Sequence, residues 1–169
     1  NSTVVRDRIR AVYGIDAEVL PPPYGIDRDG PLRPVGGLDA GYVVCVSRLL
    51  PYKHDDAVIE AFRGLPGERL VVAGAGPQLE PLRREAPANV RLLGAVDDAE
   101  LRWLYRHASG LVAASHEDFG LTPLEANAFG IPAATLRWGG FLDTVVDGEN
   151  GVLFDEVEPE SIRTALRRL

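Results

Sequence analysis

Residues Ser115 to Gly130 read SHEDFGLTPLEANAFG, and they follow an apolar run from Leu111 to Ala114. Such a run is typical of a strand that is buried on both faces of a sheet. After it, Thr122 fits the N-cap of a helix, Pro123 fits the first helical position, and Gly130 fits the residue just past the end. The stretch therefore predicts a strand, a short loop and a helix in succession.

The loop of this unit is suited to binding an anion. The free N–H groups of a first helical turn, together with the helix dipole, favour a phosphate, and Gly120 lets it approach the backbone closely. Glu117 and Glu125 flank that turn, where carboxylates accept hydrogen bonds from sugar or ribose hydroxyls. Taken alone, however, Glu125 also fits a capping box with Thr122, and Glu117 also fits a solvated loop.

The composition is that of one ordinary globular domain with an acidic surface. The 169 residues are 46% hydrophobic and 25% charged, with a net charge of −7. An acidic chain without a basic stripe argues against nucleic acid as a partner, and no stretch resembles a membrane span or a signal peptide. The single cysteine, Cys45, is expected to be a small buried hydrophobe. We expect a cytoplasmic location, or a peripheral one at the inner membrane through a further domain.

Short apolar segments alternate with amphipathic ones along most of the chain. We expect strands at 42–47, 69–73, 90–93, 110–114, 131–136 and 151–154, and helices at 55–64, 77–85, 97–107, 123–129, 141–147 and 159–169. This alternation predicts a Rossmann-like, doubly wound parallel α/β sheet in three layers, α/β/α. In such sheets ligands bind beyond the carboxyl ends of the strands.

The first 40 residues have a different pattern. We expect a helix from Ser2 to Tyr13 that ends at Gly14, and a short strand from Ala17 to Leu20. The three prolines that follow cannot belong to a central strand, and residues 24–40 read as a linker or wrapping segment. The compact domain is therefore expected to begin near Gly41.

The loops after the other strands also carry candidate ligand groups. After the first strand, VSRLLPYK places Arg48 and Lys53 five residues apart, a pair suited to a diphosphate, although pairing with Asp55 or Asp56 explains them equally well. After the second strand, Gly74 opens GAGP, a tight turn with Pro77 expected to start the next helix.

Three further features belong to loops. After the third strand, Gly94 to Asp97 forms a turn with Asp97 as the expected N-cap, and its backbone could face a nucleobase. Gly139 and Gly140 are most simply explained as a flexible turn. His116 has no spacing typical of a metal site, so we expect a loop histidine.

In this order VSRLLPYK, VVAGAGP, the turn at Gly94 and EDFGLTPLE resemble the donor-binding half of a retaining glycosyltransferase of family 4, which has the GT-B fold and belongs to the glycosyl transferases group 1. The resemblance covers essentially the whole chain. It implies that residues 41–169 form the nucleotide-sugar-binding domain. Residues 1–40 would then be a remnant of the acceptor-side domain together with the hinge.

The resemblance also implies roles for individual residues. Arg48, Lys53 and Glu117 would be catalytic, because the two cations would stabilise the leaving diphosphate and Glu117 would lie near the transferred sugar. Glu125 would accept hydrogen bonds from the ribose hydroxyls. Backbone groups would complete the donor site; they belong to Gly74, Val96, Phe119, Gly120, Leu121 and Thr122.

The implied reaction moves a hexose to an acceptor hydroxyl with retention and needs neither metal nor other cofactor. The donor would be a nucleotide diphosphate sugar, either GDP-mannose or a UDP-sugar. Because the acceptor domain is missing, we expect this chain to bind donor without appreciable transfer.

Two other interpretations compete with this one: half of a sugar-nucleotide epimerase, and a nucleotide-binding or interaction module without chemistry. A dehydrogenase is disfavoured because Leu79 replaces the third glycine of the dinucleotide fingerprint.

Overall fold

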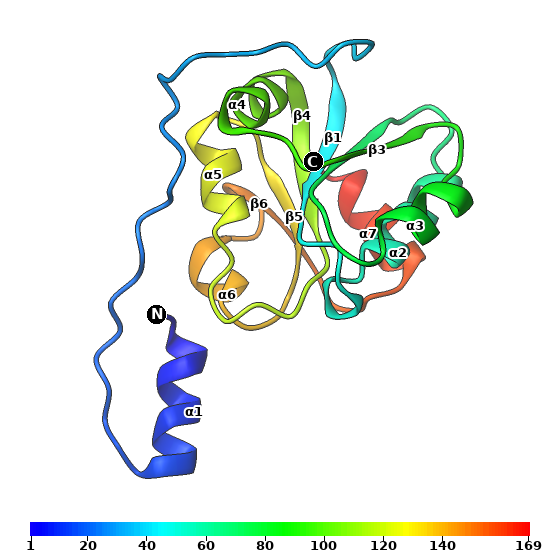
Figure 1. The fold of residues 1–169 in the computed structure, drawn as a ribbon. Helices are drawn as coiled ribbons and strands as arrows, with labels where there is room; N and C mark the ends of the chain where they lie inside the picture. Colours follow the sequence, from blue (N-terminus) through cyan, green and yellow to red (C-terminus); the bar gives the residue numbers. More distant parts are fainter.

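The computed structural model describes residues 1–169 and contains one six-stranded sheet with helices on both faces (Figure 1). The strands are β1 (Tyr42–Val46), β2 (Leu70–Ala73), β3 (Val90–Gly94), β4 (Ala108–Ala113), β5 (Ala133–Leu136) and β6 (Gly151–Phe154). The helices are α1 (Thr3–Tyr13), the short 3-10 helix η1 (Pro51–Lys53), α2 (Asp55–Arg63), α3 (Leu79–Glu85), α4 (Asp98–His107), α5 (Thr122–Ala128), α6 (Phe141–Thr144) and α7 (Pro159–Leu166).

The sheet has the order β3-β2-β1-β4-β5-β6, and every neighbouring pair of strands is parallel. The chain runs outward from β1 to β3, returns to the centre, and continues outward from β4 to β6. The predicted doubly wound, Rossmann-like sheet is therefore confirmed. Its direction of winding reverses between β1 and β4, which is the switch point at which ligands bind in such folds.

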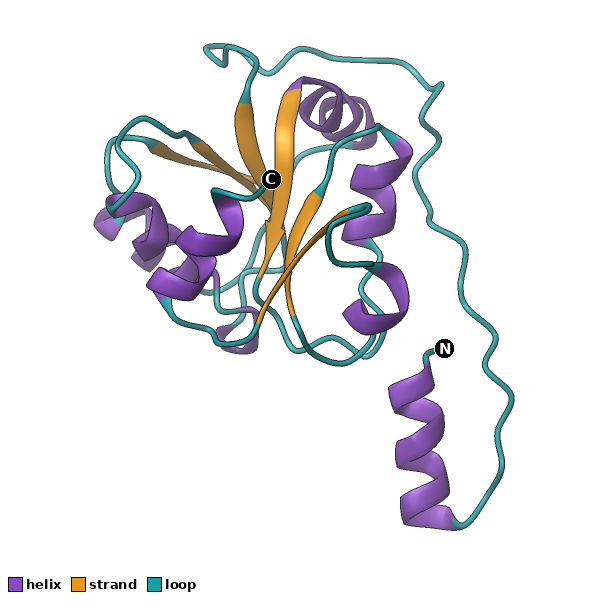
Figure 2. Cartoon of the chain, turned by 180° about the vertical axis from the view of Figure 1, so that it is seen from behind, coloured by secondary structure: helices purple, strands orange, loops and turns teal.

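Helices cover both faces of the sheet, so the strands are buried on both sides. Figures 1 and 2 show α4, α5 and α6 on one face and α2, α3 and α7 on the other. All four residues of β2, LVVA, are buried, as are the first four of β1. A continuous apolar run is the expected pattern for such strands. No helix combines the length and the apolar character that crossing a bilayer requires.

Helix α1 stands apart from the sheet and is joined to it by a long extended segment (Figure 1). As predicted, it begins after an N-cap at Ser2 and ends at Gly14, whose φ is +66°. None of its residues is buried. Its first turn lies against α6, because the Thr3 backbone N–H donates to Asp143 at 2.6 Å, and a carboxylate is favourable at a helix N-terminus.

The segment that joins α1 to β1 lies along α4. The Arg102 guanidinium donates to the Pro31 carbonyl at 3.1 Å, and Arg106 donates to the Arg28 carbonyl at 3.2 Å. Ile26 is buried in the hydrophobic core. Residues 26–31 therefore wrap the domain and are fixed to it by side chains of α4.

The structure corrects several local predictions, among them the end of the last helix, α7, which lies at Leu166 rather than at Leu169, and the start of β5, which lies at Ala133 rather than at Ile131. Residues 17–20 are not a strand, because they lie in the segment beyond the sheet, where no neighbouring strand is available to pair. Helix α3 starts at Leu79 rather than at Pro77, because Pro77 and Gln78 form a turn that precedes it, in which the N–H of Gln78 donates to the Leu49 carbonyl. Helix α6 ends at Thr144, three residues earlier than predicted.

Candidate functional site

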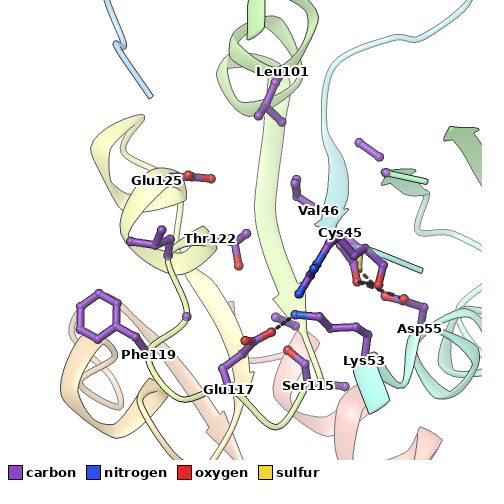
Figure 3. Close-up of a pocket in the computed structure, with 18 of the residues that line it drawn as sticks. Cys45, Val46, Lys53, Asp55, Leu101, Ser115, Glu117, Phe119, Thr122 and Glu125 are labelled. Atoms are coloured by element: carbon purple, nitrogen blue, oxygen red, sulfur yellow. Dashed lines mark hydrogen bonds and ion pairs between the residues drawn. The ribbon is translucent and has the colours of Figure 1, made fainter. Parts of the chain in front are cut away.

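A cavity of about 700 Å³ opens at the carboxyl ends of β1 and β4, at the switch point of the sheet (Figure 3). Its walls are the loops after β1, β2, β3 and β4, the first turns of α2 and α5, and Leu101 of α4. Asn1 and Pro22 from the N-terminal segment also line it. The volume lies in the range of small-molecule and cofactor sites.

All ten predicted site residues line this cavity. They are Arg48, Lys53, Gly74, Val96, Glu117, Phe119, Gly120, Leu121, Thr122 and Glu125. They come from four strand-end loops and from the first turn of α5, which the parallel sheet brings to one edge. The structure thus brings the ten residues together at one cavity, while their roles in binding and catalysis remain predictions.

Lys53 and Glu117 face one another across the cavity and form an ion pair (Figure 3). Their side chains are 11% and 24% exposed. This contact replaces the alternative in which the two cations pair with Asp55 or Asp56. Arg48 contacts no carboxylate, and its guanidinium donates instead to the Tyr52 hydroxyl at 3.1 Å. One wall of the cavity thus carries a cation that no acid neutralises.

Glu125 does not form the capping box that the sequence pattern allows. Leu121 is already helical, with φ −79° and ψ −29°, and its carbonyl accepts the hydrogen bond from the Glu125 N–H. Thr122 therefore lies inside α5 rather than at its N-cap, which is Leu121. The Glu125 carboxylate instead accepts a hydrogen bond from the Tyr105 hydroxyl at 2.8 Å. Burial raises the pKa of Glu125, and this effect outweighs the hydrogen bond from Tyr105, which lowers the pKa.

The glycines near the cavity allow loops to pack closely against one another. A Cβ on Gly139 would lie 2.2 Å from the Glu117 carbonyl oxygen, and one on Gly140 would lie 2.2 Å from the Cα of Phe119. The Gly140 N–H also donates to the Glu117 carbonyl at 2.9 Å. These glycines are thus not simply a flexible turn, as the sequence suggested, because they buttress the loop that carries Glu117.

The backbone at Gly120 is also confined. Its φ is +81°, which favours glycine, and a Cβ there would lie 2.3 Å from the Phe141 ring. The ring of Phe119 points away from the Lys53–Glu117 pair (Figure 3). Gly120 is therefore required for packing against α6 as well as for any approach of a ligand.

A polar cluster in the wall of the cavity is not apparent from the sequence. The Asp55 carboxylate accepts hydrogen bonds from the Ser47 hydroxyl at 3.1 Å and from the Cys45 thiol at 3.4 Å. Cys45 is buried as predicted, but it is also a donor. Burial raises the pKa of Asp55 from 3.8 to about 6, and it outweighs the hydrogen bonds from Ser47 and Cys45, which lower the pKa. Asp55 is buried and its neighbour Asp56 is exposed. The sequence alone does not reveal this difference.

The raised pKa of Asp55 predicts a pH-dependent stability. Because this acid binds its proton more readily in the folded state, its stabilising contribution is fully present below pH 3.8 and is lost as the pH rises through about 6. At about 1.4 kcal/mol per pKa unit, the loss amounts to at most about 3 kcal/mol. Urea denaturation between about pH 4 and about pH 7 measures it. Asp55→Asn should remove this part of the slope and Asp56→Asn should not; an unchanged slope in Asp55→Asn would contradict the assignment.

His116 follows the loop prediction but has a partner. Its Nδ1 lies 3.1 Å from Nε2 of His54, and its ring packs edge-on against Trp138 at a centroid distance of 4.8 Å. His54 is the only non-glycine residue with a positive φ, +56°. No group of three or more His, Cys, Asp or Glu side chains is placed to hold a metal ion.

Comparison with protein families gives one match over most of the chain. The sequence pattern of the family described as glycosyl transferases group 1 matches residues 36–169. A GDP-mannose-dependent alpha-(1-6)-phosphatidylinositol monomannoside mannosyltransferase of Mycolicibacterium smegmatis is 34% identical, over 98% of this chain and 50% of its own length. The glycogen synthase of Thermus thermophilus is 35% identical, over 92% of this chain and 41% of its own.

The chain thus spans about half, or less, of the length of these relatives. Among solved structures, Anabaena Alr3699/HepE in complex with UDP-glucose is similar with a TM-score of 0.68 and 25% identity, over 75% of this chain and 38% of the other. The lipopolysaccharide outer core galactosyltransferase WaaB, at 21% identity and a TM-score of 0.74, shares the fold over 99% of this chain and 50% of its own.

Proposed function

The chain belongs to the glycosyl transferases group 1 family, and from this premise we propose that its cavity binds the nucleotide diphosphate sugar donor of a retaining, family 4 hexosyltransferase. The observation that carries the proposal is the convergence of Arg48, Lys53, Glu117 and Glu125 on one cavity at the switch point of the sheet. Two cations and two carboxylates are the groups that a diphosphate and a set of sugar hydroxyls require.

The diphosphate is assigned to the side of the cavity formed by Arg48 and Lys53. Arg48 has no acidic partner, so its guanidinium is available to an anion. Lys53 carries three N–H donors, so it can contact Glu117 and a phosphate oxygen together. In the reaction both cations stabilise the negative charge that develops on the departing diphosphate, which makes the proposed transfer independent of a metal ion.

The carboxylates and the backbone groups are assigned to the rest of the donor. Glu117 accepts hydrogen bonds from the transferred sugar, and Glu125 accepts them from the ribose. The amides of residues 119–122 face the sugar and the diphosphate, Gly74 lies beside the diphosphate, and Val96 contacts the base; all of these residues line the same cavity. A relative named as GDP-mannose-dependent and a neighbour solved with UDP-glucose support GDP-mannose or a UDP-sugar as the donor.

We further propose that residues 1–40 belong to the acceptor-side half of a longer protein and to its hinge. Helix α1 buries none of its residues, and Val12, Tyr13, Ile15 and Leu20 are exposed apolar side chains. A helix with an apolar face needs a partner against which to bury it. Because the acceptor side of the cleft is incomplete, residues 1–169 bind donor without appreciable transfer.

Titration calorimetry with GDP, UDP and ADP tests the proposed function. We expect one of the three to bind at least about tenfold more tightly than its nucleoside, since a charge-assisted contact contributes roughly 1.5–3 kcal/mol. The preferred base identifies the donor class. Heat from none of the three would refute donor binding and would favour an interaction module without nucleotide chemistry.

A further inference from the structure

Tyr105 of α4 is a buried phenol with one polar partner. Its side chain is fully buried, and its ring stacks on Phe129 at a centroid distance of 5.4 Å and an interplanar angle of 23°. Its hydroxyl donates to Oε2 of Glu125 at 2.8 Å. Packing on all sides therefore fixes the position of this donor, which leaves the hydroxyl directed at a carboxylate that lines the cavity.

The hydrogen bond leaves part of the Glu125 carboxylate free. A carboxylate has two oxygens with about four acceptor sites, and Tyr105 occupies one of them on Oε2. No other side chain donates to Glu125, and Figure 3 shows this residue on α5, on the same side of the cavity as Thr122. The remaining acceptor sites are therefore available to a ligand that enters the cavity.

We propose that Tyr105 is a positioning residue, which holds the Glu125 carboxylate so that its free acceptor sites receive the two neighbouring ribose hydroxyls of the donor. This inference rests on the proposed function. It adds a residue that does not touch the ligand and that no sequence motif identifies. Without the phenol, Glu125 would rotate among several side-chain conformers, and ordering it would lower the affinity for the ribose.

Helix α4 connects this contact with the part of the cavity assigned to the base. Leu101 lines the cavity, and Tyr105 follows four residues later, so both side chains lie on one face of the helix. The same helix is capped by Asp97, whose side chain accepts hydrogen bonds from the Ala99 and Glu100 N–H groups and fixes the turn after Val96. One helix, α4, thus supports the part of the cavity that is assigned to the base and also orients the Glu125 carboxylate that is assigned to the ribose.

Tyr105→Phe tests the inference because it removes one oxygen and keeps the buried ring. Calorimetry compares GDP and UDP with their 2′,3′-dideoxy forms, which lack both ribose hydroxyls. We expect the variant to bind the preferred ribose nucleotide about 3- to 10-fold more weakly, as one net hydrogen bond predicts. Its affinity for the dideoxy form should stay within about twofold of the wild type. In a Glu125→Ala background, which has no side chain at this position for Tyr105 to hold, Tyr105→Phe should have no comparable effect on ribose selectivity.

Tyr42→Phe is the matched control. Tyr42 is also buried, and its hydroxyl donates to the Leu104 carbonyl of the same helix at 3.0 Å. This variant should lose stability in urea denaturation as Tyr105→Phe does, yet keep the wild-type ratio between ribose and dideoxy affinities. An equal loss for both nucleotide forms in Tyr105→Phe, or no loss, overturns the inference alone. Failure of the wild type to bind GDP, UDP and ADP alike overturns both the inference and the proposed function.

Discussion

Lys53→Ala is expected to weaken binding of the preferred nucleoside diphosphate by about 10- to 100-fold, because a charge-assisted contact contributes roughly 1.5–3 kcal/mol. Part of this loss should come from Glu117, because the substitution leaves its carboxylate without an ion-pair partner. An unpaired carboxylate on the cavity wall would repel the incoming diphosphate. Calorimetry with the diphosphate and with the corresponding nucleoside measures the effect, and nucleoside affinity should change less than about twofold.

Two comparisons separate these contributions. Glu117→Gln in the Lys53→Ala background removes the repelling charge, so it should recover part of the diphosphate affinity. Arg84→Ala serves as the charge control, because Arg84 is an exposed cation of α3 that does not line the cavity. Equal losses for diphosphate and nucleoside in Lys53→Ala would show that this lysine does not face the phosphates.

Arg48→Ala should also weaken binding of the nucleoside diphosphate, but less than Lys53→Ala does. Arg48 is exposed and neutralises no acid, so its removal exposes no carboxylate to the ligand. Solvent also screens its charge more strongly than that of Lys53, whose side chain is only 11% exposed. The order of the two losses therefore tests which cation lies closer to the bound diphosphate.

The fold and the location of the site could be predicted from the sequence because both depend on patterns that are local along the chain. Apolar runs alternating with amphipathic segments imply parallel strands, and the carboxyl ends of parallel strands meet at one edge. Loops as far apart as those of Arg48 and Glu117 therefore had to converge. The cap at Asp97 was predictable for the same reason, since its partners are two and three residues away.

Individual partners could not be predicted, because they depend on packing between distant elements. Tyr105 and Glu125 are 20 positions apart, and nothing in the pattern of α4 distinguishes this buried tyrosine from an ordinary core residue. The capping box failed because Leu121 adopts a helical conformation one residue before the expected start. The sequence pattern of Thr122 and Glu125 fits either arrangement, and it does not contain the hydrogen bond that Glu125 accepts from Tyr105 of α4.

Gly74→Ala is expected to lower the free energy of unfolding by about 4 kcal/mol or more, which combines the strain of an unfavourable φ with the cost of overpacking. Gly74 follows β2 with a φ of +143°, and a Cβ there would lie 1.7 Å from the Ser47 carbonyl oxygen. Relief requires the loops after β1 and β2 to separate. Such a movement would strain the hydrogen bond from the Ser47 N–H to Ala73, at 3.0 Å, and the one from the Gly74 N–H to Gly94, at 2.8 Å.

Urea denaturation measures this loss, and Gly67→Ala is the matched control, because a Cβ on Gly67 meets no atom within 4 Å. The control should change stability by less than about 1 kcal/mol. If Gly74→Ala also costs under about 1 kcal/mol, the two loops can part easily, and the wall that carries Arg48 is not rigid. The positions of the proposed phosphate ligands would then depend on donor binding instead of being set by the fold. A large loss of stability in Gly74→Ala, with Gly67→Ala unaffected, would instead mean that close packing of these two loops fixes the wall that carries Arg48 before any donor binds.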